Sequence, residues 1–218
     1  MATTLGLDEA GRGCVLGDLV VGGFLLDDNQ LQALIDTGAT DSKKLSQRKR
    51  ERILSQLPAI GICSRRHITP AEIDDGNMNQ LEEAAFISLI LEHKPNTVII
   101  DAPTHPRGIP AVLQRLQSAL RADVHYQSHP LPTFIIEPKA DLNYPAVSAA
   151  SIVAKVQRDN DLVEHQAEGS GYPSDPKTRR WLKNFIRTGE DFPACVRKRW
   201  GTIDNLRTEV AQEQRTIP

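Results

Sequence analysis

The sequence has few cysteines, and their placement limits which kinds of protein it can be. Cys14, Cys63 and Cys195 are the three cysteines among 218 residues, and no two of them form a Cys-x-x-Cys pair. An odd, scattered set argues against a disulfide framework and against a cysteine-based zinc site. We therefore expect a protein of a reducing compartment, with the cytoplasm as its location.

Long hydrophobic segments are also missing. Runs such as Val20 to Leu26 are too short to cross a membrane, and Gly22 and Gly23 interrupt this one. The first residues lack a basic stretch followed by an apolar segment, so we expect neither a secretory signal nor membrane association. Internal repeats and low-complexity tracts are absent too. With 39% hydrophobic residues, the chain can bury a sizeable core.

The net charge of −2 hides an uneven distribution. Residues 41–67 carry eight Lys or Arg against two acids, residues 68–101 carry one against seven, and residues 175–207 carry nine against four. Basic stretches in a nearly neutral chain suit a polyanion that crosses part of the surface. Solvated helix faces would give the same counts, so each stretch alone leaves both interpretations open.

Strand-like and helix-like segments alternate, which predicts an α/β fold. Residues 97–103 form a β-branched run, typical of a strand buried on both faces with helices on each side. Within a strand predicted over residues 14–28, Gly22 and Gly23 indicate a bend or bulge. Apolar spacing and breakers predict helices over residues 31–35, 47–57, 78–91, 109–122, 145–166 and 176–188, and a short final helix.

Two adjacent carboxylates, Asp8 and Glu9, precede the turn Gly11-Arg12-Gly13. On a regular strand they would point to opposite faces, so both reach one site only where the strand ends or bulges. Carboxylates beside flexible backbone donors and a guanidinium are the parts of a cation-and-phosphate site. An acidic strand end followed by a polar turn explains the stretch equally well.

Two further acids stand at informative places. Asp101 ends the buried strand, where α/β sheets place their sites, and Asp141 comes just before the longest predicted helix. Four acids without a histidine or cysteine partner favour Mg²⁺ or Mn²⁺. With the basic stretches, they indicate metal-assisted phosphodiester chemistry, in which two cations about 3.5–4 Å apart can activate water and stabilise the leaving oxygen.

The helix predicted from Pro145 carries a polar stripe whose role is open. Its members recur at helical spacing and are Ser148, Ser151, Lys155 and Arg158. A solvated helix face and a functional face are equally consistent with this pattern.

The chain closely resembles ribonuclease HII over nearly its whole length. The matching motifs are Leu7-Asp8-Glu9-Ala10-Gly11-Arg12-Gly13, Asp41-Ser42-Lys43-Lys44-Leu45, Ile100-Asp101-Ala102, Lys139-Ala140-Asp141 and the segment from Tyr144 to Lys155. The loop at 169–176 and the segment Val196-Arg197-Lys198-Arg199-Trp200 resemble the archaeal branch, which is similar to the eukaryotic catalytic subunit.

The resemblance implies an RNase H-like fold, with a mixed central sheet flanked by helices. It implies a catalytic domain over residues 1–168 and a C-terminal helical substrate-binding region over residues 169–218. It also implies a metal-dependent endoribonuclease that cleaves the RNA strand of RNA–DNA hybrids and the 5′ side of ribonucleotides embedded in duplex DNA, as in ribonucleotide excision repair. The products would carry 3′-hydroxyl and 5′-phosphate ends, and we expect a monomer.

Site residues follow from the same resemblance. The four metal-binding carboxylates of the family match Asp8, Glu9, Asp101 and Asp141. The segment Gly11-Arg12-Gly13 matches the backbone reader of the ribose 2′-hydroxyl, and Tyr172 matches the tyrosine that stacks on the following deoxyribose. Lys43 is expected nearest the scissile phosphate, and further phosphate contacts are expected from Lys44, Lys155 and the C-terminal basic residues.

Three alternatives compete with this interpretation. A phosphatase with an aspartyl nucleophile needs a second Asp two positions on, where this chain has Ala10 and Pro103. A non-catalytic hybrid-binding module has no reason to gather acids beside a polyanion. Another nuclease of the same fold, such as a junction resolvase, is disfavoured by the Gly-Arg-Gly turn and Tyr172.

Overall fold

The structure is a computed structural model that describes residues 2–39 and 45–215. Lys43 and Lys44 lie outside the described residues, so their predicted phosphate contacts stay predictions. The chain divides into two compact units, which are described separately. The first unit comprises residues 1–10, 20–67 and 78–157, and the second comprises residues 11–19, 68–77 and 158–218. The predicted substrate-binding role of residues 169–218 stays a prediction.

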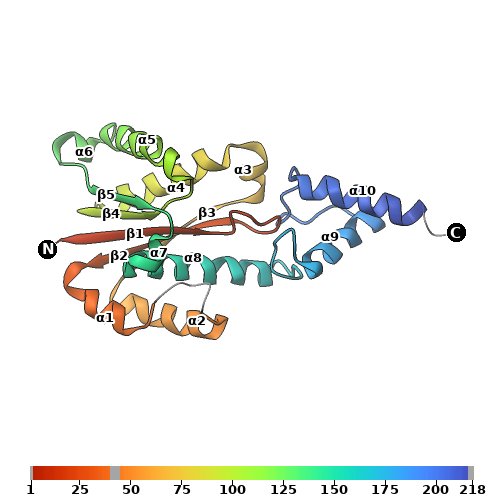
Figure 1. Cartoon of the computed structure of the whole chain (residues 1–218), viewed down its shortest axis with the longest axis horizontal. Coiled ribbons are helices and arrows are strands. Elements are labelled where there is room, and N and C mark those ends of the chain that lie inside the picture. The colour runs from red at the N-terminus through yellow and green to blue at the C-terminus, as the bar shows by residue number, and fades with distance from the viewer. Residues whose placement is uncertain (1, 40–44, 216–218) are drawn as a thin grey trace. The chain divides into compact units, whose positions relative to one another are not determined.

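One mixed sheet of five strands, in the order β3-β2-β1-β4-β5, forms the centre of the first unit (Figure 1). The strands are β1 (Thr3–Ala10), β2 (Leu19–Asp27), β3 (Gly61–Ile68), β4 (Thr97–Asp101) and β5 (Thr133–Glu137). β1 pairs antiparallel with β2 and parallel with β4, and β4 pairs parallel with β5. The α/β class and the mixed sheet are therefore confirmed.

Helices cover both faces of this sheet. Figure 1 shows α4, α5 and α6 on one side and α1, α2 and α8 on the other. Their bounds are α1 (Leu31–Asp36), α2 (Gln47–Gln56), α4 (Met78–His93), α5 (Ile109–Arg121), α6 (Val124–Ser128), α7 (Ala140–Asn143) and α8 (Pro145–Glu164). Short 3-10 turns span Asp28–Gln30, Leu57–Ala59 and Pro106–Gly108. None of the described helices is long and apolar enough to span a membrane.

Glycines let α8 pack directly against the sheet. A Cβ on Gly22 would lie 2.3 Å from the Ala150 carbonyl oxygen, and one on Gly6 would lie 2.3 Å from that of Ala146. The predicted bend or bulge at Gly22 and Gly23 is wrong, because β2 pairs with β1 without interruption. These glycines serve close packing instead, against α8 at Gly22 and against Leu89 of α4 at Gly23.

The second unit contains α3 (Pro70–Asp75), α9 (Pro176–Thr188) and α10 (Gly201–Arg215). Side chains cap two of these helices: Thr69 forms a capping box with Glu72 before α3, and Asp175 accepts from the Lys177 N–H at 3.0 Å before α9. The final helix, predicted to be short, has 15 residues. Its inner face carries Ile203, Leu206 and Val210, which are buried.

Candidate active site

Three carboxylates from separate elements meet in the first unit. Asp8 lies near the end of β1, Asp101 ends the parallel neighbour β4, and Asp141 lies in α7. Each offers a carboxylate oxygen within 4.8 Å of an oxygen of the other two. Asp8 and Asp141 are buried, and Asp101 is half-buried. The acids that the sequence places 93 and 40 positions apart thus share one small space.

Glu9, the fourth predicted acid, lies outside this group of three. β1 continues regularly through Ala10, so Asp8 and Glu9 keep the alternation of a strand. Glu9 remains near enough for its charge to raise the pKa of Asp8, and its backbone N–H donates to Asp8 Oδ1 at 2.8 Å. The structure therefore gives Glu9 a place beside the group rather than within it.

Burial and neighbouring negative charges destabilise the ionised form of Asp8. Desolvation raises the pKa of Asp8 well above its ordinary value, and the charges of Glu9 and Asp101 raise it further. Hydrogen bonds from the Ser151 hydroxyl and the Glu9 N–H oppose this shift. A cation placed among these oxygens would stabilise the ionised form.

Backbone and hydroxyl donors orient the acids. The Lys139 N–H donates to Asp101 Oδ1 at 2.7 Å, and Lys139 holds a left-handed φ of 62° to do so. The Ser148 hydroxyl donates to the carbonyl of Asp141, and Ser151 bonds Asp8. The two serines of the polar stripe are buried, so this part of the stripe supports the acids rather than facing solvent.

The donor set fits a divalent metal ion. Three carboxylates with no histidine or cysteine among them are the hard oxygen ligands that Mg²⁺ and Mn²⁺ prefer. Burial first, and then the charges of Glu9 and Asp101, raise the pKa of Asp8, and a bound cation would offset both effects. Asp8, Asp101 and Asp141 are thus the residues that could hold the ion, with Glu9 beside them.

The Gly-Arg-Gly turn lies in the second unit and requires glycine at its first position. Gly11 has a φ of +94°, and a Cβ there would lie 2.6 Å from the Asp18 carbonyl oxygen. The Cys14 N–H closes the turn on the Gly11 carbonyl at 3.1 Å. Gly13 is exposed, and its Cβ position lies 3.8 Å from Cε1 of Tyr172. The predicted 2′-hydroxyl reader and the predicted stacking tyrosine are therefore neighbours.

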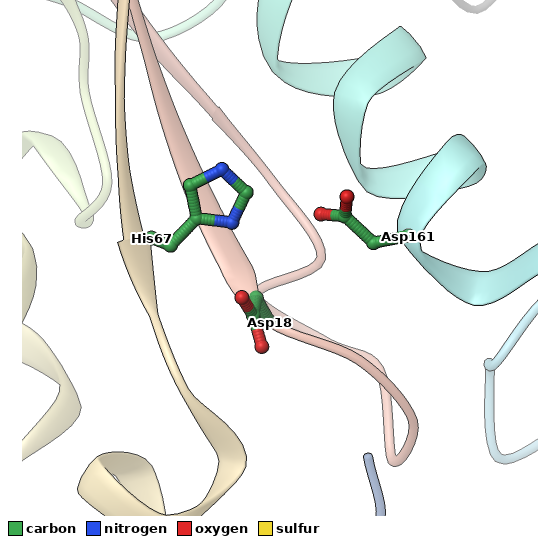
Figure 2. Close-up of side chains that lie close together, drawn as sticks. All are labelled: Asp18, His67 and Asp161. Carbon is green, nitrogen blue, oxygen red and sulfur yellow. The ribbon is translucent and has the colours of Figure 1, made fainter. Parts of the chain in front are cut away.

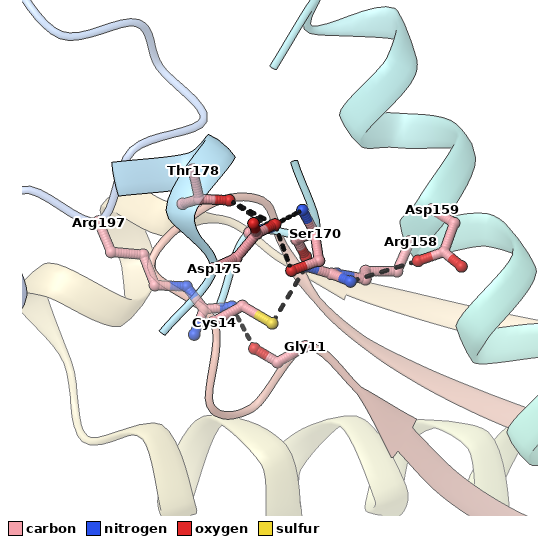
Figure 3. Close-up of polar contacts among 9 residues, drawn as sticks. Gly11, Cys14, Arg158, Asp159, Ser170, Asp175, Thr178 and Arg197 are labelled. Atoms are coloured by element: carbon pink, nitrogen blue, oxygen red, sulfur yellow. Dashed lines mark hydrogen bonds and ion pairs between the residues drawn. The ribbon is translucent and has the colours of Figure 1, made fainter. Parts of the chain in front are cut away.

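Arg197 is one of the C-terminal basic residues from which phosphate contacts were expected as a group. Its side chain is buried and turned inward, so it does not present its charge to phosphate. Its guanidinium donates to the carbonyl of Gly11 at 2.8 Å (Figure 3). It also donates to the carbonyls of Arg12 at 3.2 Å and Gly17 at 3.0 Å. Burial lowers the pKa of Arg197 to about 10, which still leaves it charged at neutral pH. Arg197 supports the turn from within.

Other C-terminal basic side chains are engaged with acids. The ion pairs between α9 and α10 are Arg179–Glu209, Lys183–Glu209, Lys183–Glu213 and Arg187–Glu213, with N–O distances of 2.6 to 2.9 Å. The basic count of residues 175–207 therefore overstates the positive charge that this region offers to phosphate.

A second pair of acids lies in the second unit. Asp18 and Asp161 offer carboxylate oxygens within 4.8 Å of each other (Figure 2). His67, also drawn there, belongs to the first unit. Two carboxylates alone do not define a metal site.

Comparison with known proteins decides the family. The family model for ribonuclease HII matches residues 5–203. A protein described as ribonuclease HII from Pyrococcus horikoshii is 38% identical over 97% of this chain and 96% of its own. The chain belongs to the ribonuclease HII family. Proteins of this family are metal-dependent ribonuclease H hydrolases that cleave RNA in RNA–DNA hybrids, so the enzyme class is established.

Solved structures agree with the ribonuclease HII assignment. The crystal structure of ribonuclease H2 from Pyrococcus horikoshii OT3 has a TM-score of 0.80 and 37% identity, and the match covers 96% of this chain and 99% of that one. A crystal structure of Bst-RNase HIII in complex with Mn²⁺ has a TM-score of 0.73 at 16% identity, covering 97% and 71%. The second match supports the fold alone, and the RNase H-like fold is confirmed.

Proposed function

We propose that this member of the ribonuclease HII family cleaves on the 5′ side of ribonucleotides, both in RNA–DNA hybrids and singly embedded in duplex DNA. The products would carry 3′-hydroxyl and 5′-phosphate ends. The observation that carries the proposal is the meeting of Asp8, Asp101 and Asp141 within 4.8 Å, in a chain whose turn Gly11–Gly13 adjoins Tyr172.

The acids would hold Mg²⁺ or Mn²⁺, with Glu9 as a fourth ligand. Bound as a pair, such cations would activate the attacking water and stabilise the leaving oxygen. The chain's own contribution is to fix its ligands beforehand. Asp101 is oriented by the Lys139 N–H, and Asp8 by Ser151. These bonds would hold the two carboxylates in the orientation in which they bind a metal ion.

Recognition of the ribose would rest on the turn and the tyrosine. Only the 2′-hydroxyl distinguishes ribose from deoxyribose, and it lies in an accessible minor groove. Gly13 is exposed and has no side chain, so backbone groups of the turn can approach that hydroxyl. Burial raises the pKa of Tyr172, so its ring stays neutral and can stack on the next sugar.

Contacts with the substrate beyond the site of cleavage would come from other parts of the chain. We propose residues 169–218 as the region that contacts the duplex beyond the cut, and Lys43 as the contact nearest the scissile phosphate. We also propose a cytoplasmic monomer that takes part in ribonucleotide excision repair. Mg²⁺ and Mn²⁺ suit the oxygen ligands equally well.

The experiment is cleavage of a labelled DNA duplex that carries one ribonucleotide, beside a long RNA–DNA hybrid and an all-DNA duplex. Each is incubated with Mg²⁺, with Mn²⁺, or with EDTA. We expect metal-dependent cleavage of the first two at the 5′ side of a ribonucleotide, and none of the all-DNA duplex. Cleavage confined to the hybrid would contradict the embedded-ribonucleotide activity, and cleavage of the all-DNA duplex would contradict 2′-hydroxyl recognition.

A further inference from the structure

Arg158 is a fully buried cation that the proposed reaction does not use directly. It lies in α8, belongs to the second unit, and is 1% exposed. It is a member of the polar stripe of α8, whose role the sequence alone leaves open. Arginine side chains are almost never fully buried unless hydrogen bonds or ion pairs compensate their charge. The groups that Arg158 contacts therefore indicate its role.

Those groups belong to the Gly-Arg-Gly turn and to the loop at residues 169–176, which carries Tyr172 and is called the tyrosine loop below. Arg158 Nη2 donates to Cys14 Sγ at 3.0 Å, at the end of the Gly-Arg-Gly turn, and also to the carbonyl of Ser170, two residues before Tyr172 (Figure 3). Its guanidinium carbon lies 5.5 Å from the centroid of the Tyr172 ring, a cation–π distance. Nη1 bonds Asp159 at 3.2 Å, which compensates part of the buried charge.

The backbone of the tyrosine loop packs closely against the Arg158 guanidinium. Gly171 has a φ of +79°, and a Cβ there would lie 2.5 Å from Arg158 Nη2, so the loop backbone passes directly over the guanidinium. The Gly171 carbonyl in turn accepts from the Val15 N–H at 2.8 Å and the Leu16 N–H at 3.3 Å. The turn and the loop are thus joined at the point that Arg158 occupies.

Arg197, the other buried arginine, has different partners. Its guanidinium donates to the carbonyls of Gly11, Arg12 and Gly17, and its guanidinium carbon lies 5.0 Å from the Trp200 ring centroid. It therefore supports the turn but makes none of these bonds to the tyrosine loop. The chain offers a matched pair of buried arginines that differ in whether they hold Tyr172.

We infer that Arg158 is a positioning residue that sets the preference for a ribonucleotide followed by deoxyribose, because it fixes Tyr172 against the turn. The inference rests on the proposed function and deepens it. Lysine keeps the charge but loses the planar fork that reaches Cys14 and Ser170 together, and it stacks more weakly on the ring. Arg158→Lys therefore loosens the tyrosine loop while leaving the acids unchanged.

The test compares kcat/KM for a single embedded ribonucleotide with kcat/KM for a long hybrid, in four proteins. Relative to wild type, we expect Arg158→Lys to lower this ratio by about 10- to 100-fold, since a misplacement of about 1 Å can cost about 100-fold in rate. Arg197→Lys should lower both values by a similar factor, since both substrates present a 2′-hydroxyl to the turn. The control Arg115→Lys, at an exposed arginine that pairs with Glu83 at 2.7 Å, should leave both unchanged.

An unchanged ratio in Arg158→Lys, or the same fall in Arg197→Lys, would overturn the inference, since either result indicates general loosening. If Arg158→Lys fails to fold by circular dichroism, Asp175→Asn replaces it. Asp175 holds Ser170 through the N–H and through the hydroxyl at 2.8 Å, so its loss should lower the same ratio. A wild-type enzyme that cleaves neither substrate would instead contradict the proposed function.

Discussion

The ionised Asp8 side chain is unfavourable in the metal-free fold, because burial removes its water and Glu9 and Asp101 repel it. A carboxyl group whose pKa is higher in the folded than in the unfolded chain binds more protons when folded. Stability therefore falls as pH rises from the ordinary carboxyl pKa toward the raised value. A divalent cation would offset this loss because it binds only the folded arrangement.

Asp8→Asn tests this charge. The amide keeps an oxygen that can accept from the Glu9 N–H, but it removes the repelled charge. In EDTA at pH 7 we expect the melting temperature to rise by about 2–4 °C, which corresponds to about 1 kcal/mol in a chain of this size. Calorimetric melting across pH 4–8 measures it. A variant with the same melting temperature and pH slope as wild type would contradict the account of the Asp8 pKa.

Among the helices and strands, α8 and the sheet pack so closely that two strand positions have no room for a side chain. Gly22 brings β2 against the Ala150 carbonyl, and Gly6 does the same for β1 at Ala146. The same helix carries Ser148 and Ser151, which bond the acids. A displaced α8 would therefore disturb the site as well as the core.

Gly22→Ala should destabilise the fold by about 3 kcal/mol or more, because the new methyl group would overlap the α8 backbone rather than a movable side chain. Gly201→Ala is the control, since nothing lies within 4 Å of a Cβ there and the residue begins α10. That change should be neutral or stabilise by up to about 1 kcal/mol. Urea unfolding compares them, and equal midpoints would contradict the close packing.

Local signals in the sequence predicted much at this scale. The helices predicted over residues 47–57 and 176–188 are observed as α2 and α9. Ser46 caps the first and Gly189 ends the second, and such signals depend on only a few neighbouring residues. The role of Gly22 was missed, because its partner is 128 positions away. Apolar periodicity alone does not distinguish a strand glycine that bulges from one that packs.

Over the whole molecule, counts of basic residues overestimate the positive charge that the surface presents to phosphate. A sequence shows that Arg197 is positive but not that it points inward, and it does not show that Lys183 is paired with Glu209. The convergence of Asp8 and Asp101 was predictable, since strand ends in an α/β sheet meet at one edge, and Asp141 joins them from α7, which follows the end of β5. The offset of Glu9 follows from the regular continuation of β1 through Ala10.

Duplex binding should still depend on salt through exposed basic side chains that contact phosphate. If about three to five phosphates are contacted, raising KCl from about 50 to 200 mM lowers affinity about 40- to 500-fold. Fluorescence anisotropy with a hybrid in Ca²⁺ or EDTA measures binding without cleavage. An affinity that does not change with salt would show that phosphate contacts contribute little.

Hydrolysis is expected to require a divalent ion that Asp8, Asp101 and Asp141 bind. Titration calorimetry with Mn²⁺ on wild type, Asp101→Asn and the exposed-acid control Asp204→Asn tests it most directly, with cleavage measured on the same samples. We predict that Asp101→Asn keeps its fold but loses Mn²⁺ binding and cleavage together, while Asp204→Asn matches wild type. Wild-type Mn²⁺ affinity or full turnover in Asp101→Asn would contradict the claim.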